Sequence, residues 1–407
     1  MEWPRYPLGE VAPACPADIE FPPTKVVWQL GLEHIESHTG AVASKVRAPA
    51  GEAGNSTFAF DEGNVLYSKL RPYLNKVVVP DEPGIATSEL IPLRPRPNLI
   101  LREYLAYYLR SPAFVSFASQ FVTGAKMPRV ILDKFWAHPV PLPPPSEQRR
   151  IVEILAQADR LRRLRAEAGA KADRILPALF IKMFGDPTTN PMGWPTAPLG
   201  TLFAQDKAAV DGVTGKDLPY LGLEHIESGT GRILISQAEA RKVKVRGLAY
   251  RFGPQHVLYG KLRPYLNKVA LPSFEGRCST ELVPLLPSRS VPREFIAAYL
   301  RLPYIVNAAI AKNRGARMPR ADMRLLMQMK VPIPPTQAQK DFASKYLKVE
   351  DISRRLNNVK SCLDVLFSVL LNQAFTGSLT ASWREARMRE LLQEMEEQAA
   401  VLAEVEI

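Results

Sequence analysis

The chain has few cysteines and no long uncharged apolar run. These two absences exclude several classes of protein. Its 407 residues include three cysteines, Cys15, Cys278 and Cys362, which lie far apart and form no CxxC pair. This excludes a disulfide framework and a cysteine zinc site. No uncharged apolar run approaches the roughly 18 residues that cross a bilayer, and the opening MEWPRYPLGE does not resemble a secretion signal. We therefore expect a protein of the reducing cytoplasm.

Motifs for nucleotide-dependent chemistry are also missing. The chain has no GxxxxGK[ST] phosphate loop, because residues 212–216 (GVTGK) are too short a match and no hydroxyl residue follows them. It also lacks a GxGxxG turn for a nucleotide-like cofactor and a GxSxG nucleophile elbow. We therefore expect a non-catalytic chain with no bound cofactor.

One acidic and histidine-containing cluster could suggest a metal or acid–base site. It comprises Glu33, His34 and Glu36, and it recurs at Glu224, His225 and Glu227. On a strand, neighbouring residues such as Glu33 and His34 would face opposite ways. Neither copy has a second histidine at metal spacing, and HExxH is absent. A structural or hydrogen-bonding role is the favoured interpretation, and no metal site is expected.

Charge is what the chain has in excess. Lys and Arg number 53 against 41 Asp and Glu, which gives a formal net charge of +12. Such a balance favours a polyanionic partner, with nucleic acid first and an anionic membrane surface second.

Nearly the whole chain is one unit of about 190 residues written twice. LGLEHIES at residues 30–37 returns at 221–228, and KLRPYLNKV at 69–77 returns at 261–269. GAKMPR at residue 124 likewise returns as GARMPR at residue 315. This period is too long for a solenoid repeat, so it predicts two duplicated domains with two similar sites.

Each copy ends in a long helical pattern with heptad spacing. The first seam reads Ile151, Ile154, Ala158, Leu161, Ala168, Ala172, Ile175 and Leu179, and the second reads Val349, Ile352, Leu356, Val359, Leu363, Leu366 and Leu370. We expect the two helices to pair as an antiparallel coiled coil. The alternative is that each helix packs on its own domain. Pro177 should kink or end the first helix. A helix of about 38 residues would be roughly 57 Å long and could act as a ruler between the domains.

The repeated KLRPYLNKV segment carries the candidate DNA contacts. In an extended chain Lys69, Arg71, Tyr73 and Asn75 would share one face. Cations, an aromatic ring and an amide can bind phosphates, stack on a base and contact a base edge. The alternative is a solvated strand in which one cation pairs with the acidic loop at residues 81–82.

GAKMPR adds cations in a glycine-bearing loop, and a third basic segment lies in the second copy alone. The predicted DNA-binding residues of the two shared motifs are Lys69, Arg71, Tyr73, Asn75, Lys76, Lys126, Arg129, Lys261, Arg263, Tyr265, Asn267, Lys268, Arg317 and Arg320. Because both copies carry these residues, they should grip the backbone, and base readers should lie where the copies differ. ARKVKVRG supplies Arg241, Lys242, Lys244 and Arg246 in such a region. The alternative is that this segment is a solvated strand edge protected by its charge.

Taken together, these motifs resemble the specificity (S) subunit of Type I restriction-modification enzymes, to about Leu379. The resemblance rests on the duplication, the proline-rich exits VPLPPPSEQRRIV and VPIPPTQAQ, and the loop TGAKMPR before the first of them. It also rests on the linker LFIKMFGDPTTNPMGWP and its distal partner LLNQAFTGSLT. A tail from Trp383 to Ile407, acidic at EMEEQ, departs from that pattern.

The resemblance implies an α+β protein with two target-recognition domains separated by two long antiparallel coiled-coil helices. The implied segments are domain 1 at 1–145, a central helix at 146–185, domain 2 at 186–335, a distal helix at 336–378 and a helical tail at 379–407. Each domain would read one half of a bipartite site on double-stranded DNA. The helices would dock two S-adenosylmethionine-dependent adenine methyltransferase (M) subunits, and motor-nuclease (R) subunits would join for ATP-dependent cleavage.

Two other classes stay open at this point. One is a stand-alone or orphan DNA-binding protein that works without methyltransferase partners. The other is a nuclease built on Glu33, His34, Glu36 and Asp81, which is disfavoured because the second copy has Phe274-Glu275 where Asp81-Glu82 would align.

Overall fold

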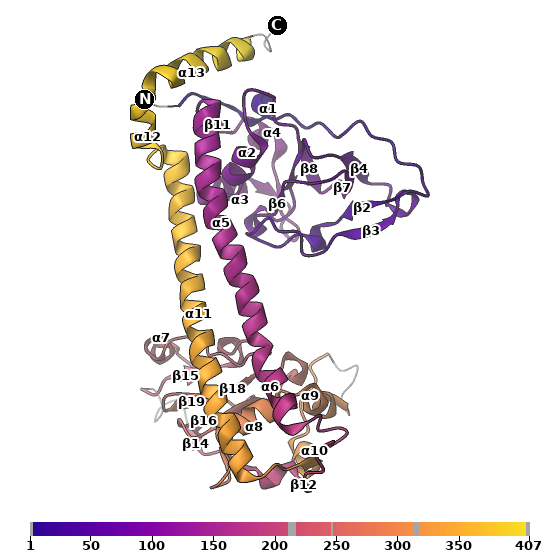
Figure 1. Ribbon diagram of the computed structural model, residues 1–407, viewed down its shortest axis with the longest axis vertical. Helices are drawn as coiled ribbons and strands as arrows, with labels where there is room; N and C mark the ends of the chain where they lie inside the picture. The colour runs from indigo at the N-terminus through magenta and orange to yellow at the C-terminus, as the bar shows by residue number, and fades with distance from the viewer. Residues whose placement is uncertain (1–2, 211–216, 246, 312–316, 404–407) are drawn as a thin grey trace. The chain divides into compact units, whose positions relative to one another are not determined.

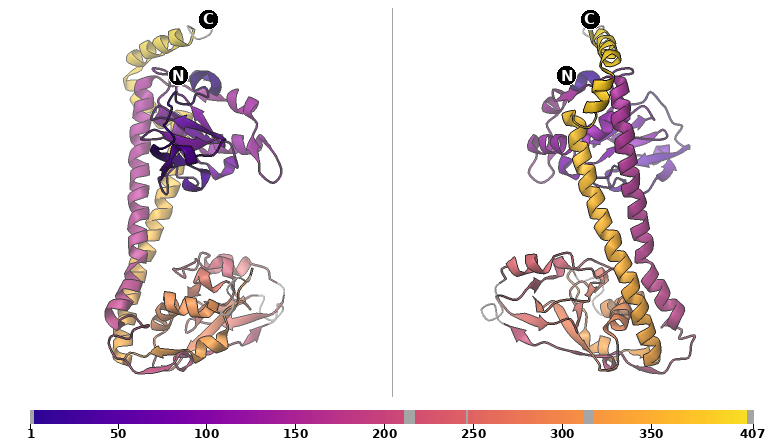
Figure 2. Two further views of the ribbon diagram at one scale, coloured as in Figure 1. Left: turned by 90° about the vertical axis from the view of Figure 1, so that its right-hand side faces the viewer. Right: turned by 60° about the vertical axis from the view of Figure 1, so that its left-hand side comes forward.

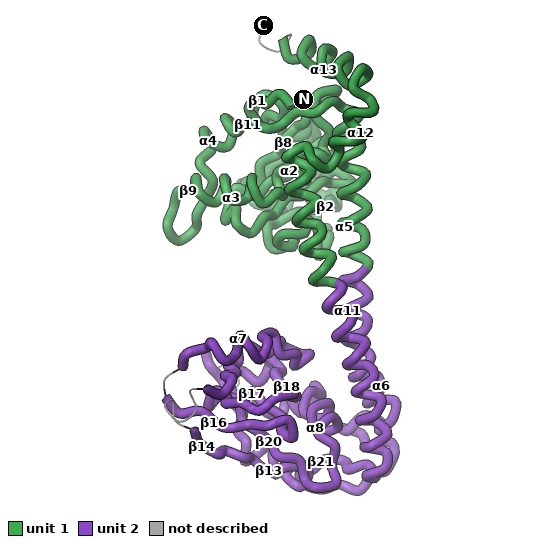
Figure 3. Tube along the Cα trace, turned by 90° about the vertical axis from the view of Figure 1, so that its left-hand side faces the viewer, with its two compact units in different colours: residues 1–164, 360–407 green, residues 165–359 purple. Residues whose placement is uncertain are grey.

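The computed structural model describes residues 3–210, 217–245, 247–311 and 317–403. Arg246 of the basic segment, residues 212–216 and the start of GARMPR therefore lie outside the described residues. The chain divides into two compact units, of which unit 1 comprises residues 1–164 and 360–407 and unit 2 comprises residues 165–359 (Figure 3). Each unit therefore takes one part of each long helix.

Unit 1 contains two main sheets with helices packed beside them, and two further sheets of two strands each, β1-β11 and β10-β9 (Figure 1). One sheet has the order β3-β2-β7-β4, with β2 and β7 parallel, and the other has the order β6-β5-β8. The strands are β1 (Arg5–Pro7), β2 (Val26–Leu30), β3 (Val46–Pro49), β4 (Thr57–Phe60), β5 (Val65–Ser68), β6 (Val77–Val78), β7 (Gly84–Thr87), β8 (Leu90–Leu93), β9 (Val122–Thr123), β10 (Arg129–Val130) and β11 (Pro139–Pro141). The helical segments before the long helix are α1 (Leu8–Val11), η1 (Leu32–His34), η2 (Ala50–Glu52), η3 (Pro72–Leu74), α2 (Arg102–Leu109), α3 (Pro112–Gln120) and α4 (Leu132–Trp136).

Unit 2 repeats this plan. Its two main sheets have the orders β14-β16-β19-β15 and β13-β20-β17-β18, and β15 and β19 are parallel like their counterparts β2 and β7. Strands β12 and β21 form a further two-stranded sheet, as β1 and β11 do in unit 1. The strands are β12 (Thr196–Pro198), β13 (Phe203–Gln205), β14 (Ala209–Val210), β15 (Tyr220–Leu221), β16 (Ala249–Phe252), β17 (Val257–Gly260), β18 (Val269–Ala270), β19 (Gly276–Ser279), β20 (Leu282–Pro287) and β21 (Lys330–Pro332). The helical segments are η4 (Leu199–Thr201), η5 (Leu223–His225), α7 (Gln237–Lys242), η6 (Pro264–Leu266), α8 (Arg293–Leu300), α9 (Pro303–Ile310) and α10 (Met323–Gln328).

Two long helices contribute to both units. Helix α5 (Pro145–Asp173) continues as α6 (Ile175–Phe184), and α11 spans Thr336–Thr376. The break at Arg174 has a simple cause: Pro177 has no N–H to donate to the carbonyl of Asp173 four residues earlier, so the helical bonding is interrupted there. The expectation of a kink or an early end at Pro177 is thus confirmed.

The helices run antiparallel within each unit. In unit 1 the Arg162 Nε of α5 donates to the Asp364 carboxylate of α11 at 2.8 Å. In unit 2 the rings of Phe180 on α6 and Phe342 on α11 are 5.5 Å apart. Both views of Figure 2 show the helices side by side. The α+β class with two duplicated domains and two long antiparallel helices is confirmed.

The predicted apolar seams are partly wrong. Leu161, Ile175, Ile352, Val359 and Leu366 are exposed rather than packed between helices. Ile151 of the predicted seam is buried as expected, but the other buried positions of α5 in unit 1, Glu147, Gln148, Leu155 and Asp159, lie outside that seam. Ile151 and Leu155 belong to the same core as Tyr104 of α2 and Phe375 of α11. Each helix packs on its own domain as well as on the other helix. Its buried face therefore includes residues outside the predicted seam and leaves some seam residues exposed.

Helix α11 contains a stretch that is long and apolar enough to cross a membrane by length and composition alone. Phe367, Leu371 and Ala374 of this stretch are buried in the core of unit 1. The helix therefore forms part of a packed protein core, although several of its apolar side chains remain exposed.

The C-terminal tail forms α12 (Ala381–Ala386) and α13 (Met388–Ala403) and packs on unit 1. Glu147 at the start of α5 is fully buried and accepts hydrogen bonds from Thr380 Oγ1 at 2.6 Å and Arg384 Nε at 2.8 Å. It also accepts from Trp3 Nε1 at 3.0 Å. Glu394 of α13 caps α5, since its carboxylate accepts from the Ser146 N–H at 2.9 Å. The tail is an integral part of unit 1.

Candidate nucleic-acid interface

KLRPYLNKV is not an extended strand, which corrects the first expectation about the site. Pro72–Leu74 form the 3-10 turn η3, flanked by Arg71 and Asn75 in the left-handed region at φ 50° each. Proline favours such a turn, and asparagine tolerates the left-handed conformation. Arginine rarely adopts that conformation, and non-glycine residues there cost on the order of 1 kcal/mol or more. Unit 2 repeats both left-handed residues, at Arg263 and Asn267.

Backbone hydrogen bonds join the turn to the GAKMPR loop. The Arg71 N–H donates to the Pro128 carbonyl at 2.7 Å, and the Val130 N–H donates to the Lys69 carbonyl at 2.9 Å. The same bonds recur in unit 2, where the Arg263 N–H donates to the Pro319 carbonyl at 2.7 Å. Two motifs that lie more than 50 residues apart in the sequence therefore form one surface in each unit.

Four side chains of this surface stay accessible to a ligand, although Lys69 and Lys261 are only half-exposed. We call them basic patch 1 (Lys69, Arg71, Tyr73 and Lys126) and basic patch 2 (Lys261, Arg263, Tyr265 and Arg317). The tyrosine rings are 48% and 51% exposed, which is unusual for large aromatic side chains. Among the residues that the structure describes, no ion pair neutralises the cations of either patch. The acidic loop expected to compete for them binds elsewhere, because Asp81 and Glu82 pair with Lys45 and Arg47.

Asn75 and Lys76, predicted as DNA contacts, point into the protein. Asn75 is buried and its Nδ2 donates to the Arg110 carbonyl at 3.1 Å. Lys76 Nζ donates to the Leu32 carbonyl at 2.7 Å. Their counterparts do the same, since Asn267 bonds the Arg301 carbonyl at 2.8 Å and Lys268 bonds the Leu223 carbonyl at 2.7 Å. These four residues hold the turn in place, which corrects their assignment as contacts.

Arg129 and Arg320 are already paired with acids. The Arg129 guanidinium contacts Glu89 at 2.7 Å and holds the pKa of that carboxyl below its usual value. Arg320 contacts Glu281 in the same way at 3.1 Å. Phosphate contact by either arginine would compete with these ion pairs.

The start of the third basic segment forms the end of a helix rather than a strand edge. Ser236 caps α7 by accepting from the Glu239 N–H at 3.2 Å. Arg241 and Lys242 occupy the last turn of this helix, Lys244 follows it, and all three are exposed.

The acidic and histidine-containing cluster has a structural role. His34 Nδ1 accepts from the Gly31 N–H at 3.0 Å within η1, and His225 Nδ1 accepts from the Gly222 N–H at the same distance in η5. The expected structural or hydrogen-bonding role is thus confirmed for the histidine of each cluster. In the part of the chain that the structure describes, no group of three His, Cys, Asp or Glu residues could hold a metal ion.

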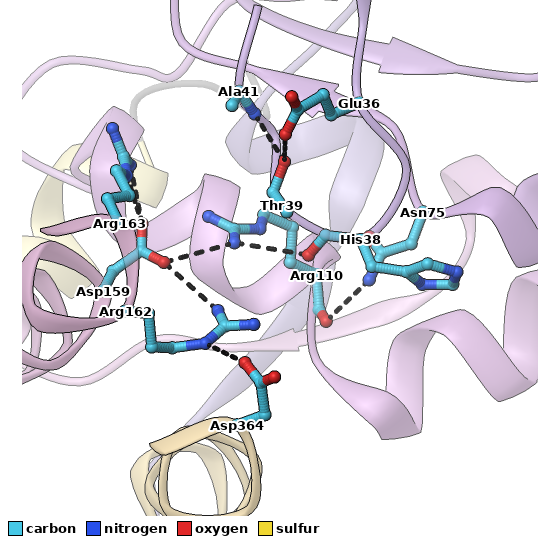
Figure 4. A network of polar contacts seen from close by, with 10 residues as sticks. All are labelled: Glu36, His38, Thr39, Ala41, Asn75, Arg110, Asp159, Arg162, Arg163 and Asp364. Atoms are coloured by element: carbon cyan, nitrogen blue, oxygen red, sulfur yellow. Dashed lines mark hydrogen bonds and ion pairs between the residues drawn. The ribbon is translucent and has the colours of Figure 1, made fainter. Parts of the chain in front are cut away.

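Sequence reasoning missed a polar network behind basic patch 1 (Figure 4). The buried Arg110 lies 3.8 Å from Asp159 of α5, and its Nη2 reaches the His38 carbonyl at 3.5 Å. The His38 N–H in turn donates to the Leu74 carbonyl of η3 at 3.1 Å. This chain of contacts ties the patch to the long helix within unit 1. No pattern in the sequence signals this network, because its members come from separate segments of the chain.

Comparison with known proteins defines the class. Residues 49–170 match the family model of the Type I restriction modification DNA specificity domain. The chain is 27% identical over 169 residues to the specificity subunit of the Type I restriction enzyme EcoDI of Escherichia coli, which is 40% of this chain but only 37% of that subunit. It is 22% identical over 347 residues to the StySPI specificity subunit of Salmonella potsdam, covering 77% of this chain and 73% of the relative.

Solved structures share the fold over nearly the full length. The S subunit of a Type I restriction-modification system from M. genitalium has a TM-score of 0.52 at 13% identity, covering 92% of this chain and 96% of that one. A chain solved in work on complex assembly and conformational transition of the type I R-M system has a TM-score of 0.55 at 18% identity, covering 93% and 98%. The resemblance predicted from the sequence is confirmed at this level: residues 49–170 match the DNA specificity domain of Type I restriction-modification systems, and the chain shares its fold with solved chains of such systems.

Proposed function

We propose that this chain is the DNA sequence-specificity subunit of a Type I restriction-modification complex and that each unit reads one half of a bipartite site. The observation that carries this proposal is the duplicated basic patch. Each patch presents cations that have no ion-pair partner among the described residues, beside an exposed tyrosine on a turn that two motifs hold together. This combination suits phosphate contact with stacking.

The patches would grip the DNA backbone, and base reading would fall to regions where the copies differ. Arg71 and Arg263, with their neighbours, are the same in both units and so carry little information about two different half-sites. Arg241, Lys242 and Lys244 lie in a segment that unit 1 does not repeat, and they are candidates for base contact by unit 2. The close similarity of the units further suggests half-sites related in shape or partly in sequence.

Catalysis would come from partner subunits. Exposed apolar side chains on the helix segments of unit 1, including Leu161 at 55% and Val365 at 65% exposure, are suited to a protein interface. Two methyltransferase (M) subunits would dock on the helices, and motor-nuclease (R) subunits would join them in the cytoplasm. Helices α5 and α11 each contribute to both units, so their length would set the gap between the half-sites.

The experiment that tests this proposal is genome-wide mapping of adenine methylation in the host with the gene intact and with the gene deleted. A two-part motif with a fixed unspecified gap, lost on deletion, is the expected result, and it would identify both half-sites together. Methylation that is unchanged by deletion would contradict the proposal and favour a stand-alone DNA-binding protein.

A further inference from the structure

The two units differ sharply at one equivalent place, where the long helices meet the recognition domain. In unit 1 this place is filled by Arg162 of α5 (Figure 4). Its Nε donates to Asp364 at 2.8 Å and its Nη1 donates to Asp159 at 3.2 Å. The guanidinium also lies 4.4 Å from the ring centroid of Phe367. One guanidinium thus bridges two carboxylates and packs on an aromatic ring.

The repeat keeps both acids in unit 2 but not the arginine. The offset of 191 residues takes Asp159 to Glu350 and Arg162 to Ser353, and it takes Asp364 back to Asp173. The place that a guanidinium occupies in unit 1 is therefore left to a short hydroxyl side chain in unit 2.

A cavity of about 380 Å³ opens at this place in unit 2. Asp173, Glu350 and Ser353 line it together with the apolar residues Leu176 and Ala298. The counterparts of these two apolar residues in unit 1 are the larger Phe367 and Tyr107. Three large-to-small differences, Arg to Ser, Phe to Leu and Tyr to Ala, account for the open volume.

The carboxylates of this cavity have no cation between them. Among the described residues, neither Asp173 nor Glu350 forms an ion pair, and both are exposed at the cavity. Two arginines also line the cavity, but their guanidinium groups already have partners. Arg301 donates to the Val269 carbonyl at 3.2 Å and to Tyr346 Oη at 2.9 Å, and Arg232 pairs with Glu227 at 2.6 Å. Arg354, the counterpart of the arginine that binds Asp159 in unit 1, pairs with Asp351 instead. The nearby cations are thus used elsewhere.

We propose that the cavity of unit 2 binds a guanidinium group carried on an apolar stem, seated between Asp173 and Glu350 as Arg162 is seated between Asp364 and Asp159. The stem would pack on Leu176 and Phe180. A guanidinium suits the place better than an ammonium, because its planar donors can reach two carboxylates at once and it is more weakly hydrated. The group could come from an arginine side chain of a partner protein or from a free small guanidine compound.

The site is tested by titrating n-butylguanidinium into the full chain, with n-pentylammonium as the matched amine, by calorimetry and NMR. We expect one saturable site with a Kd of about 1 mM, as befits so small a ligand, and weaker binding of the amine. Glu350→Gln should weaken binding by about tenfold, and Ser353→Arg should abolish it by filling the cavity as unit 1 does. Ser353→Ala is the control and should bind normally.

Three outcomes of this titration would overturn the proposal: no saturable binding, equal binding of the amine, or unchanged binding by the Ser353→Arg variant. The titration needs neither DNA nor partners, so its failure would leave the proposed function untouched.

The source of the group is tested in a second step, which rests on the proposed function because it uses the methyltransferase subunit. If an arginine of that subunit is the occupant, Ser353→Arg should weaken assembly and n-butylguanidinium should compete with it. If a free compound is the occupant, assembly should be unchanged and the assembled complex should still bind the probe.

Discussion

Units 1 and 2 share a backbone plan and a basic patch but stabilise the ends of their long helices in different ways. In unit 1 the helix start carries Glu147 in a buried polar cluster with Thr380 and Arg384 of the tail. In unit 2 the equivalent position is Ala338, and the helix start packs through aromatic rings such as Phe180 and Phe342. The duplicated chain has therefore kept the surface proposed to face DNA and diverged where the helices meet each domain.

The largest effect is expected when the buried polar cluster that anchors the helix in unit 1 is broken. Glu147→Ala would leave the guanidinium of Arg384 buried without its carboxylate, and breaking such a pair costs about 3 to 5 kcal/mol. We expect unit 1 to lose that much free energy of unfolding in urea and the amides of residues 381–403 to lose protection from hydrogen exchange. Unit 2, with Ala338 in this place, should be unaffected.

A paired variant checks the cause of that loss. Glu147→Ala combined with Arg384→Met removes both charges and should recover much of the lost stability. A cost below about 1 kcal/mol for Glu147→Ala alone would mean that the buried cluster does not anchor the tail.

The next prediction uses pH to destabilise unit 1 alone. Burial lowers the pKa of His138 from its usual value to about 4, and the ring lies 4.0 Å from that of Phe117. The unfolded chain takes up this proton near pH 6.5, whereas the folded unit resists it until about pH 4. The neutral His138 ring therefore makes its full contribution to the free energy of unfolding of unit 1 above pH 6.5. As the pH falls, this contribution is lost, by about 2 kcal/mol between pH 7 and pH 5.

Unit 2 provides the control for this pH dependence, since Met329 takes the place of His138 there. Hydrogen exchange at pH 7 and pH 5, corrected for intrinsic rates, should show unit 1 weakening more than unit 2. The His138→Met variant should remove the difference. If the difference persisted in that variant, another group would be responsible.

A smaller effect, with the opposite sign, is expected at Arg165. This residue is 9% exposed, and its three guanidinium nitrogens find no hydrogen-bond partner in the described part of the chain. The equivalent position in the second helix is Leu356. Replacing an unpaired buried cation with an apolar side chain is commonly stabilising. Arg165→Leu should raise the free energy of unfolding by about 1 to 2 kcal/mol in urea, and the reverse change Leu356→Arg should lower it. A loss on Arg165→Leu would show that the arginine has a partner in solution.

The sequence predicts the order of domains and helices in this protein better than it predicts which side chains contact one another. The repeat predicted the duplicated domains and the paired helices, because eight identical residues at one offset leave little room for another interpretation. The apolar spacing did not predict the buried faces of the helices, since periodicity marks apolar positions without saying which neighbour they meet. Asp159 and Arg165 are buried although they are charged, and no apolar pattern can indicate that.

The candidate site shows the same division. The residue types of KLRPYLNKV predicted a basic and aromatic surface, and Arg71, Tyr73 and Lys126 are exposed. Alternation along a strand failed because Pro72 starts a turn and Asn75 accepts the left-handed backbone, both of which are turn signals. Reading those signals would have placed Asn75 in the turn. Its hydrogen bond to the Arg110 carbonyl depends on residues 35 positions away, which local sequence does not reveal.

The smallest effect tests whether the two basic patches are equivalent. Arg71→Ala and Arg263→Ala each remove one exposed, unpaired guanidinium from the same turn, and neither residue packs in a core, so folding should be unchanged. If both grip phosphates, each variant should lower the salt dependence of DNA binding by about one counterion and weaken binding to all sequences alike. Fluorescence anisotropy across a salt series measures both quantities, with the helix variant Arg150→Ala as the control. A loss of affinity confined to one base position would instead make that arginine a base reader. A loss of affinity in only one of the two variants would end the equivalence of the patches.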